Sequence, residues 1–140
     1  MRKRIPHVLA LLLLMVFVCS CFSNYDKSEL AGRTFYADDG AVIKLNSDGS
    51  CELENINWEY AYGSSFSDIV DSLKYQKTHV GTWELEELDK QVINIVIKGF
   101  DFDVYISNSN IILPTSADDV ILIIYGDPEK LYYYEFKQRK

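Results

Sequence analysis

The sequence predicts an all-β domain: an antiparallel up-and-down β-barrel, or a β-sandwich, of about eight strands, preceded by an N-terminal signal-peptide helix. Two observations predict this class. Beyond residue 30, apolar and polar residues alternate over short stretches, with the period of two that half-buried strands show. Clusters of Gly, Asn, Asp and Ser separate these stretches about every ten residues, as turns do. A closed barrel would also remove the exposed edges of such apolar strands.

The first part of the domain contains a hairpin followed by one longer strand. Asp38-Asp39-Gly40 has the composition of the hairpin turn. Apolar residues continue from Cys51 to Tyr62, but their phase changes across Glu54-Asn55, so we predict a β-bulge at that point. Strands are expected over residues 30–36, 41–45 and 50–62.

The second part begins with an irregular stretch, residues 63–76, which is expected to be a loop or lid. Within it, residues 67–73 fit either a short helix capped by Ser67 or an irregular strand. Alternation returns at Thr78, and Gly99 permits a tight reversal. Strands are expected over residues 78–86, 93–97, 100–107, 111–113, 120–125 and 131–136.

The N-terminus has the pattern of a secretory signal peptide. Arg2, Lys3 and Arg4 precede an unbroken apolar run over residues 8–18. A helix that spans a bilayer needs about 20 apolar residues, so this run is too short to be a membrane span. We expect a signal peptide over residues 1–20, a tether over 21–29 and the β domain over 30–140.

The end of this segment, Val18-Cys19-Ser20-Cys21, resembles the lipobox of bacterial lipoproteins. In that family an aliphatic residue at −3 and a small residue at −1 precede the cysteine that is lipidated after cleavage. The resemblance implies that Cys21 carries a diacylglycerol and often a third acyl chain, palmitate among the usual ones. Two or more chains anchor a protein stably to a membrane. Phe22 stands where an inner-membrane retention aspartate would be, so the implied location is the cell-envelope membrane, and the outer one in a Gram-negative cell.

The charge and the cysteines of the processed chain limit its partners. Three of the 14 basic residues and none of the 21 acidic ones precede Cys21, so the net charge becomes −10. A domain of this charge repels nucleic acid and anionic headgroups, which leaves lipid as the means of attachment. Cys51 has no intrachain disulfide partner after processing and is expected to be a buried, inert thiol.

A second resemblance spans residues 30–137. Gly32-Arg33-Thr34-Phe35-Tyr36 looks like the Gly-x-Trp-Tyr opening of lipocalin-like barrels, with Phe35 in place of Trp. Gly81-Thr82-Trp83-Glu84-Leu85 is similar to a strand opening of small lipocalin-like lipoproteins of bacteria. The resemblance implies an up-and-down barrel with an internal apolar site.

The aromatic residues are the candidate ligand contacts, because large rings line cavities and stack on sugars. Ordinary barrel interiors are also filled by such side chains, so core packing is the alternative. The candidates are Trp58, Tyr60, Tyr62, Trp83, Tyr132 and Tyr134.

Three polar residues are the candidates for catalysis. Asp101 and Asp103 lie two apart on one strand and therefore share a face, where they could hold a proton or a cation. They are equally explained as the solvated side of that strand. His79 is the only histidine after the signal and is expected at the surface. No metal site with two histidines can form, and we expect no cofactor.

These observations predict a membrane-anchored, noncatalytic binding domain whose partner is an apolar small molecule or an envelope protein. An alternative is an inhibitor-like module that inserts an acidic loop into an enzyme cleft. A third hypothesis is an enzyme that uses Asp101, Asp103 or His79.

Overall fold

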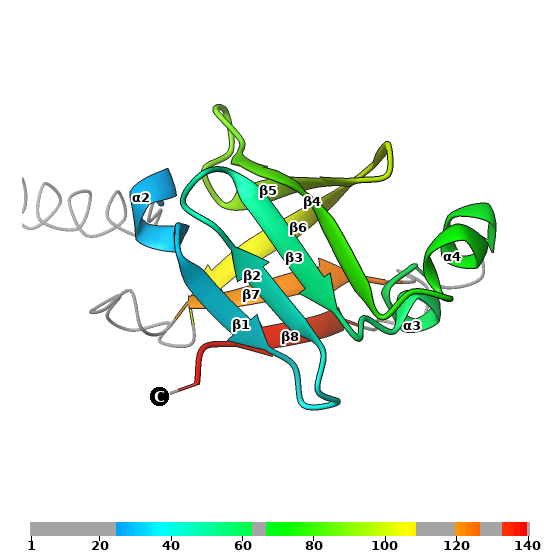
Figure 1. Ribbon diagram of the computed structural model, residues 1–140. Coiled ribbons are helices and arrows are strands. Elements are labelled where there is room, and N and C mark those ends of the chain that lie inside the picture. Colours follow the sequence, from blue (N-terminus) through cyan, green and yellow to red (C-terminus); the bar gives the residue numbers. More distant parts are fainter. Residues whose placement is uncertain (1–24, 63–66, 109–119, 127–132, 140) are drawn as a thin grey trace, which may run out of the picture.

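The protein is a closed antiparallel β-barrel with short helices at its two ends (Figure 1). The computed structural model describes residues 25–62, 67–108, 120–126 and 133–139. Within these residues eight strands follow one another around the barrel in chain order, and β8 closes it against β1. The predicted up-and-down barrel is therefore confirmed. The elements are α2 (Lys27–Leu30), β1 (Arg33–Tyr36), β2 (Val42–Leu45), β3 (Ser50–Glu54), α3 (Trp58–Tyr62), α4 (Ser67–Leu73), β4 (Thr78–Leu85), β5 (Val92–Ile97), β6 (Phe100–Asn108), β7 (Val120–Tyr125) and β8 (Tyr133–Lys137).

The interior of the barrel is filled by the inward-facing side chains of its strands. Alternation along each strand places one set of residues inside, as on β2, where Ile43 and Leu45 are buried and Lys44 is exposed. Cys51 is buried as expected, and burial raises the pKa of its thiol to about 11, which disfavours the thiolate form. The largest fully buried side chains on the strands are Phe35, Ile43, Leu45, Leu53, Trp83, Ile93, Ile95, Ile97, Leu122 and Phe136.

Two different structures cover the two ends of the barrel (Figure 1). At one end α2 lies beside Trp83, whose indole N–H donates to the Asn46 carbonyl at 3.0 Å while Lys27 Nζ lies 5.1 Å from its ring. At the other end the connection between β3 and β4 forms α3 and α4. The two ends therefore carry different helices and different side chains.

The predicted long strand over residues 50–62 is wrong. The strand β3 ends at Glu54, because Asn55 has a left-handed backbone (φ 51°) that leaves the extended conformation. The chain then enters α3, in which Trp58 and Ala61 are buried three residues apart on one helical face. The phase change at Glu54-Asn55 marks this change of structure and not a β-bulge.

The packed domain begins earlier than residue 30. Tyr25 is buried and its N–H donates to the Lys90 carbonyl at 3.4 Å, and Leu30 of α2 is fully buried. The Glu29 side chain accepts a hydrogen bond from the Asp26 N–H at 2.8 Å, which caps α2. Part of the stretch expected to be a tether is thus attached to the barrel.

Candidate functional site

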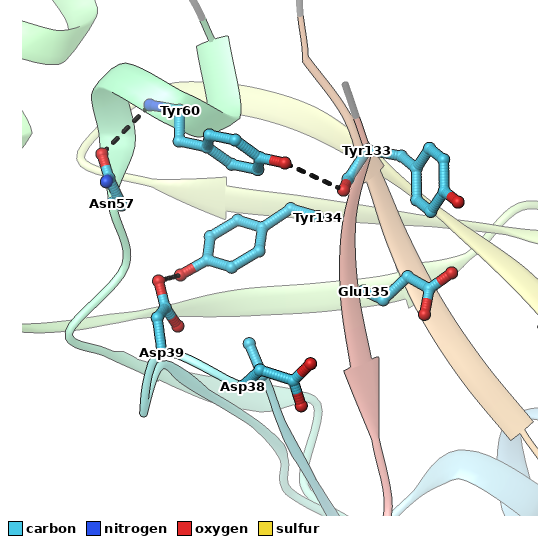
Figure 2. A pocket seen from close by; sticks show the side chains of 8 residues that line it. Asp38, Asp39, Asn57, Tyr60, Tyr133, Tyr134 and Glu135 are labelled. Atoms are coloured by element: carbon cyan, nitrogen blue, oxygen red, sulfur yellow. Dashed lines mark hydrogen bonds between the residues drawn. The ribbon is translucent and has the colours of Figure 1, made fainter. Parts of the chain in front are cut away.

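An open pocket of about 380 Å³ lies at the barrel end that carries α3 (Figure 2). It sits between the turn that joins β1 to β2, the start of α3 and the start of β8. Its lining is rich in tyrosine rings and carboxylates. The lining residues are Ala37, Asp38, Asp39, Asn57, Tyr60, Tyr133, Tyr134 and Glu135.

The pocket lies where the barrel wall is least paired. Among the described residues, β8 pairs with β1 at one position, Tyr36 with Lys137, whereas every other pair of neighbouring strands is joined by at least four. Beyond Tyr36 the chain turns back at once, since the Ala37 N–H donates to the Ala41 carbonyl at 2.9 Å. Residues 133–135 of β8 therefore face a turn and not a strand, and this open seam is the site of the pocket.

Two of the tyrosines form the aromatic wall of the pocket. The rings of Tyr60 and Tyr134 meet edge to face, with centroids 5.3 Å apart. Asn57 positions Tyr60, because its side-chain oxygen accepts the Tyr60 N–H at 3.1 Å and caps the first turn of α3. The Tyr60 hydroxyl lies 3.5 Å from the Tyr133 carbonyl, to which it donates (Figure 2). Tyr60 is 40% exposed and Tyr134 only 6%, so Tyr134 forms the floor.

The carboxylates come from both sides of the seam. Asp39 accepts a hydrogen bond from the Tyr134 hydroxyl at 2.5 Å and another from the Ala41 N–H at 3.0 Å, which ties the turn to β8. Glu135 pairs with Lys137 Nζ at 3.0 Å. Asp38 lies on the turn and lines the pocket from the side opposite α3 (Figure 2).

The protonation state of Tyr134 follows from its surroundings. Burial, and then its hydrogen bond to Asp39, raise the pKa of the phenol well above its usual value of 10. The phenol therefore remains a donor to Asp39 at every physiological pH. The negative charge at the pocket comes from the carboxylates alone.

The structure brings two of the six aromatic candidates together in this pocket and separates others. Tyr60 and Tyr134 line it. Trp58 is buried at the barrel end that carries α3, and its ring lies edge to face with the rings of His79 and Phe102. Trp83 fills the opposite end of the barrel. Tyr62 is the last residue of α3, and its side chain lies outside the described part of the protein. Tyr132 and the predicted lipidation site Cys21 also lie outside the described residues.

The three residues of the enzyme hypothesis do not form one site. The expectation that His79 lies at the surface is wrong, because it is 3% exposed and its ring faces Trp58. Its Nε2–H donates to the Leu73 carbonyl at 3.0 Å, since a carbonyl can only accept. Asp101 and Asp103 are exposed on β6, where Asp103 accepts from the Asn94 amide at 3.3 Å. The strand β5 separates β6 from the strand that carries His79.

Several pocket residues were not among the sequence candidates. Asp38 and Asp39 were assigned only to a turn, and Asn57 and Glu135 stand in no motif. Tyr133 alternates with the apolar residues of its strand and could have been found only as an exposed aromatic near a strand start. What joins these residues is the closure of β8 on β1, which no local pattern predicts.

Other classes of site are absent from the part of the chain that the structure describes. No three His, Cys, Asp or Glu side chains of residues 25–62, 67–108, 120–126 and 133–139 converge as metal ligands. None of the described helices is long and apolar enough to cross a membrane.

Comparisons with family models, curated proteins and solved structures find no match to this chain.

Proposed function

We propose that this chain is a lipid-anchored, noncatalytic binding protein of the bacterial cell envelope, and that its ligand occupies the pocket at the β1–β8 seam. The observation that carries the proposal is the convergence of Tyr60, Tyr134 and three carboxylates in one open pocket. Binding sites combine an apolar wall with a few directed polar groups in this way. Packed side chains fill the interior of the barrel, which also favours the seam pocket as the place where a ligand binds.

A binding role is favoured over catalysis by the placement of the titratable residues. His79 is buried against the Trp58 ring, and Asp101 and Asp103 project from the outer face of another strand. A general acid or base must reach the reacting atom directly or through one water molecule. In the pocket itself Asp39 is held by the Tyr134 hydroxyl and the Ala41 N–H.

The proposed lipid anchor would determine which way the pocket opens relative to the membrane. Only residues 22–24 separate Cys21 from the buried Tyr25, and this stretch spans at most about 14 Å when extended. A lipid on Cys21 would thus hold the α2 end of the barrel near the membrane. The pocket lies at the other end, beside α3, so it would open away from the bilayer toward soluble ligands or envelope proteins (Figure 1).

The anchor is tested by fatty-acid labelling of the full chain in a bacterial host. We expect the wild-type chain to take up an alkyne-tagged palmitate and to sediment with membranes, and Cys21→Ser to do neither. Cys19→Ser is the matched control, because it removes the neighbouring thiol and leaves the acceptor. Labelled, membrane-bound Cys21→Ser protein would show that the anchor is assigned wrongly.

The binding site is tested separately with a set of neutral, cationic and anionic fragments. The full chain, labelled with ¹⁵N and held in a nonionic polyoxyethylene detergent, is titrated by NMR. We expect at least one fragment class to shift the amide signals of Tyr60, Tyr133 and Glu135. Shifts confined to other parts of the barrel for every class would refute this location.

A further inference from the structure

The geometry points to a primary ammonium group as the ligand of the seam pocket, supplied either by a small amine or by a lysine side chain of a partner protein. This inference rests on the proposed function, because it names the chemistry of the ligand that the pocket takes. Four features of the described residues support it: the hydrogen-bonding groups, the charge, the aromatic wall and the spacing of the carboxylates.

The pocket offers mainly hydrogen-bond acceptors. The carboxylates of Asp38, Asp39 and Glu135 accept only, and the Tyr133 carbonyl faces the pocket, where it meets the Tyr60 hydroxyl. The Tyr134 and Tyr60 hydroxyls, which could donate, already donate to Asp39 and to the Tyr133 carbonyl, so the Asn57 amide and the Tyr133 hydroxyl are the remaining side-chain donors of the lining. A ligand group that meets the three carboxylates must donate, and an ammonium group has three donors and no acceptor.

The charge of the pocket has the matching sign. Three carboxylates line it, and among the described residues Lys137 pairs with one of them, Glu135, at 3.0 Å. Glu135, and to a smaller extent Asp38, raise the pKa of Lys137. An ammonium group of the chain itself is thus already stabilised at the edge of the pocket. The side chain of Lys137 is more than half exposed, so it can move away from Glu135 when a ligand binds.

The aromatic wall suits a cation as well. Tyr60 is 40% exposed and lines the same pocket as the carboxylates, and the faces of aromatic rings attract cations through their negative quadrupole (Figure 2). The packing of Tyr60 edge to face on Tyr134 and the cap from Asn57 hold the ring in place before a ligand arrives. Such preorganisation lowers the entropic cost of binding.

The spacing of the carboxylates selects among cations. No three acidic side chains of the described ranges converge closely enough to ligate a metal ion. Asp38 and Asp39 come from a turn and Glu135 from β8, so the acceptors approach from different directions. Three diverging N–H groups meet such acceptors better than the planar fork of a guanidinium, which prefers a single carboxylate edge.

The first experiment compares two probes of the same size that differ in charge. Propylammonium and 1-propanol are titrated against the full ¹⁵N-labelled chain in the nonionic detergent. We expect propylammonium to shift the amide signals of Tyr60, Tyr133 and Glu135 in a saturable, salt-sensitive way, and 1-propanol to leave them unchanged. Equal shifts by both probes would overturn the ammonium assignment and leave the pocket as a binding site for neutral ligands.

A pair of double variants separates contact from general charge. Asp38→Asn with Glu135→Gln should weaken propylammonium binding by about tenfold, the sum of two partly exposed ion pairs. Asp101→Asn with Asp103→Asn removes the same charge from the exposed face of β6 and should leave the affinity within about twofold. Equal losses in the two double variants would overturn the inference, as would an unchanged affinity in the first. Asp39 is left intact because it holds the turn.

A third arm distinguishes the two sources of the ammonium group. Acetyl-Gly-Lys-Gly-amide is compared with propylammonium and with the same peptide acetylated on the lysine side chain. Tighter binding of the unmodified peptide than of propylammonium indicates a protein lysine, and weaker binding indicates a free amine. Binding of the acetylated peptide as tight as that of the unmodified one would overturn the inference. If neither these probes nor any fragment shifts the pocket amides, the proposed function fails together with it.

Discussion

A single residue without a side chain allows β4 and its neighbour β5 to pack closely together. Gly81 occupies the inward position between His79 and Trp83, both of which are buried. A Cβ atom at Gly81 would lie 2.1 Å from the Val96 carbonyl oxygen and 3.0 Å from Ile97 Cγ1. Real atoms do not approach so closely, so the backbone of β5 occupies the space that any side chain would need.

We expect Gly81→Ala to lower the free energy of unfolding by about 3 kcal/mol, because the clash is with backbone and the strands must separate to relieve it. Chemical denaturation measures the loss. Gly40→Ala is the control: Gly40 has a positive φ (91°) but no atom within 4 Å of the added Cβ, so it should cost only about 1 kcal/mol. A smaller loss for Gly81→Ala than for Gly40→Ala would contradict the close approach.

At the scale of elements, the connection between β3 and β4 acts as a cover for one end of the barrel. Asn55 ends β3 and donates its N–H to the Lys77 carbonyl at 2.7 Å, which closes the base of the connection. Buried residues of α3 and α4, Trp58 and Leu73 among them, then pack against the barrel. His79 lies beneath this cover, in contact with both helices through the Trp58 ring and the Leu73 carbonyl.

The burial of His79 predicts that the cover loosens in acid. Burial lowers the pKa of His79 in the folded state below its ordinary value of 6.5, and the nearby positive charge of Lys98 lowers it further. The unfolded chain then binds the proton more tightly. The stability that neutral His79 supports is complete above about pH 6.5 and is lost as the pH falls from there toward the folded-state pKa.

The measurement is the free energy of unfolding between about pH 7.5 and about pH 5, for the wild-type chain and His79→Gln. The variant cannot be protonated, so its stability should fall less steeply with decreasing pH even if it is lower at neutral pH. All other titrating groups are shared and cancel in the comparison. Parallel pH profiles would show that His79 is protonated as easily in the folded state as in the unfolded one.

At the scale of the whole molecule, the strands are paired at more positions on one side of the barrel than on the other. The strands β4, β5 and β6 are joined by four and six paired positions, whereas β1 and β8 share one among the described residues. The hydrogen bond between Tyr134 and Asp39 and the contact of Arg33 Nη1 with Gln138 Oε1 at 3.3 Å reinforce this seam through side chains. The candidate site lies where the wall is weakest and most able to admit a ligand.

We expect hydrogen exchange to follow this difference. Amides of β1 and β8 should exchange through local opening of the seam, while those of β5 and β6 should exchange only on global unfolding. Native-state exchange read by NMR, with increasing denaturant, separates the two classes. Equal protection of β8 and β5 would mean that side-chain contacts close the seam as firmly as paired strands do.

The local pattern of the sequence predicted most of the fold. Alternation such as Ile93, Ile95 and Ile97 identifies an inward row, because a strand has a period of two and half of its residues face the core. The turn residues Lys98 and Gly99, both with positive φ, join β5 to β6 as the expected reversal at Gly99 requires. The same reasoning failed at residues 55–62, where alternating rings on α3 imitate a strand.

Short-range periodicity and composition were enough to predict an antiparallel β domain of about eight strands, as a barrel or a sandwich, a buried Cys51 and aromatic residues at the site. The contact of Asp39 with Tyr134, 95 residues further along the chain, and the burial of His79 under a helical cover became visible only in the folded barrel. Such contacts depend on how the barrel closes and on which end each turn occupies. Closure is a property of all eight strands together, so no single stretch of sequence carries it.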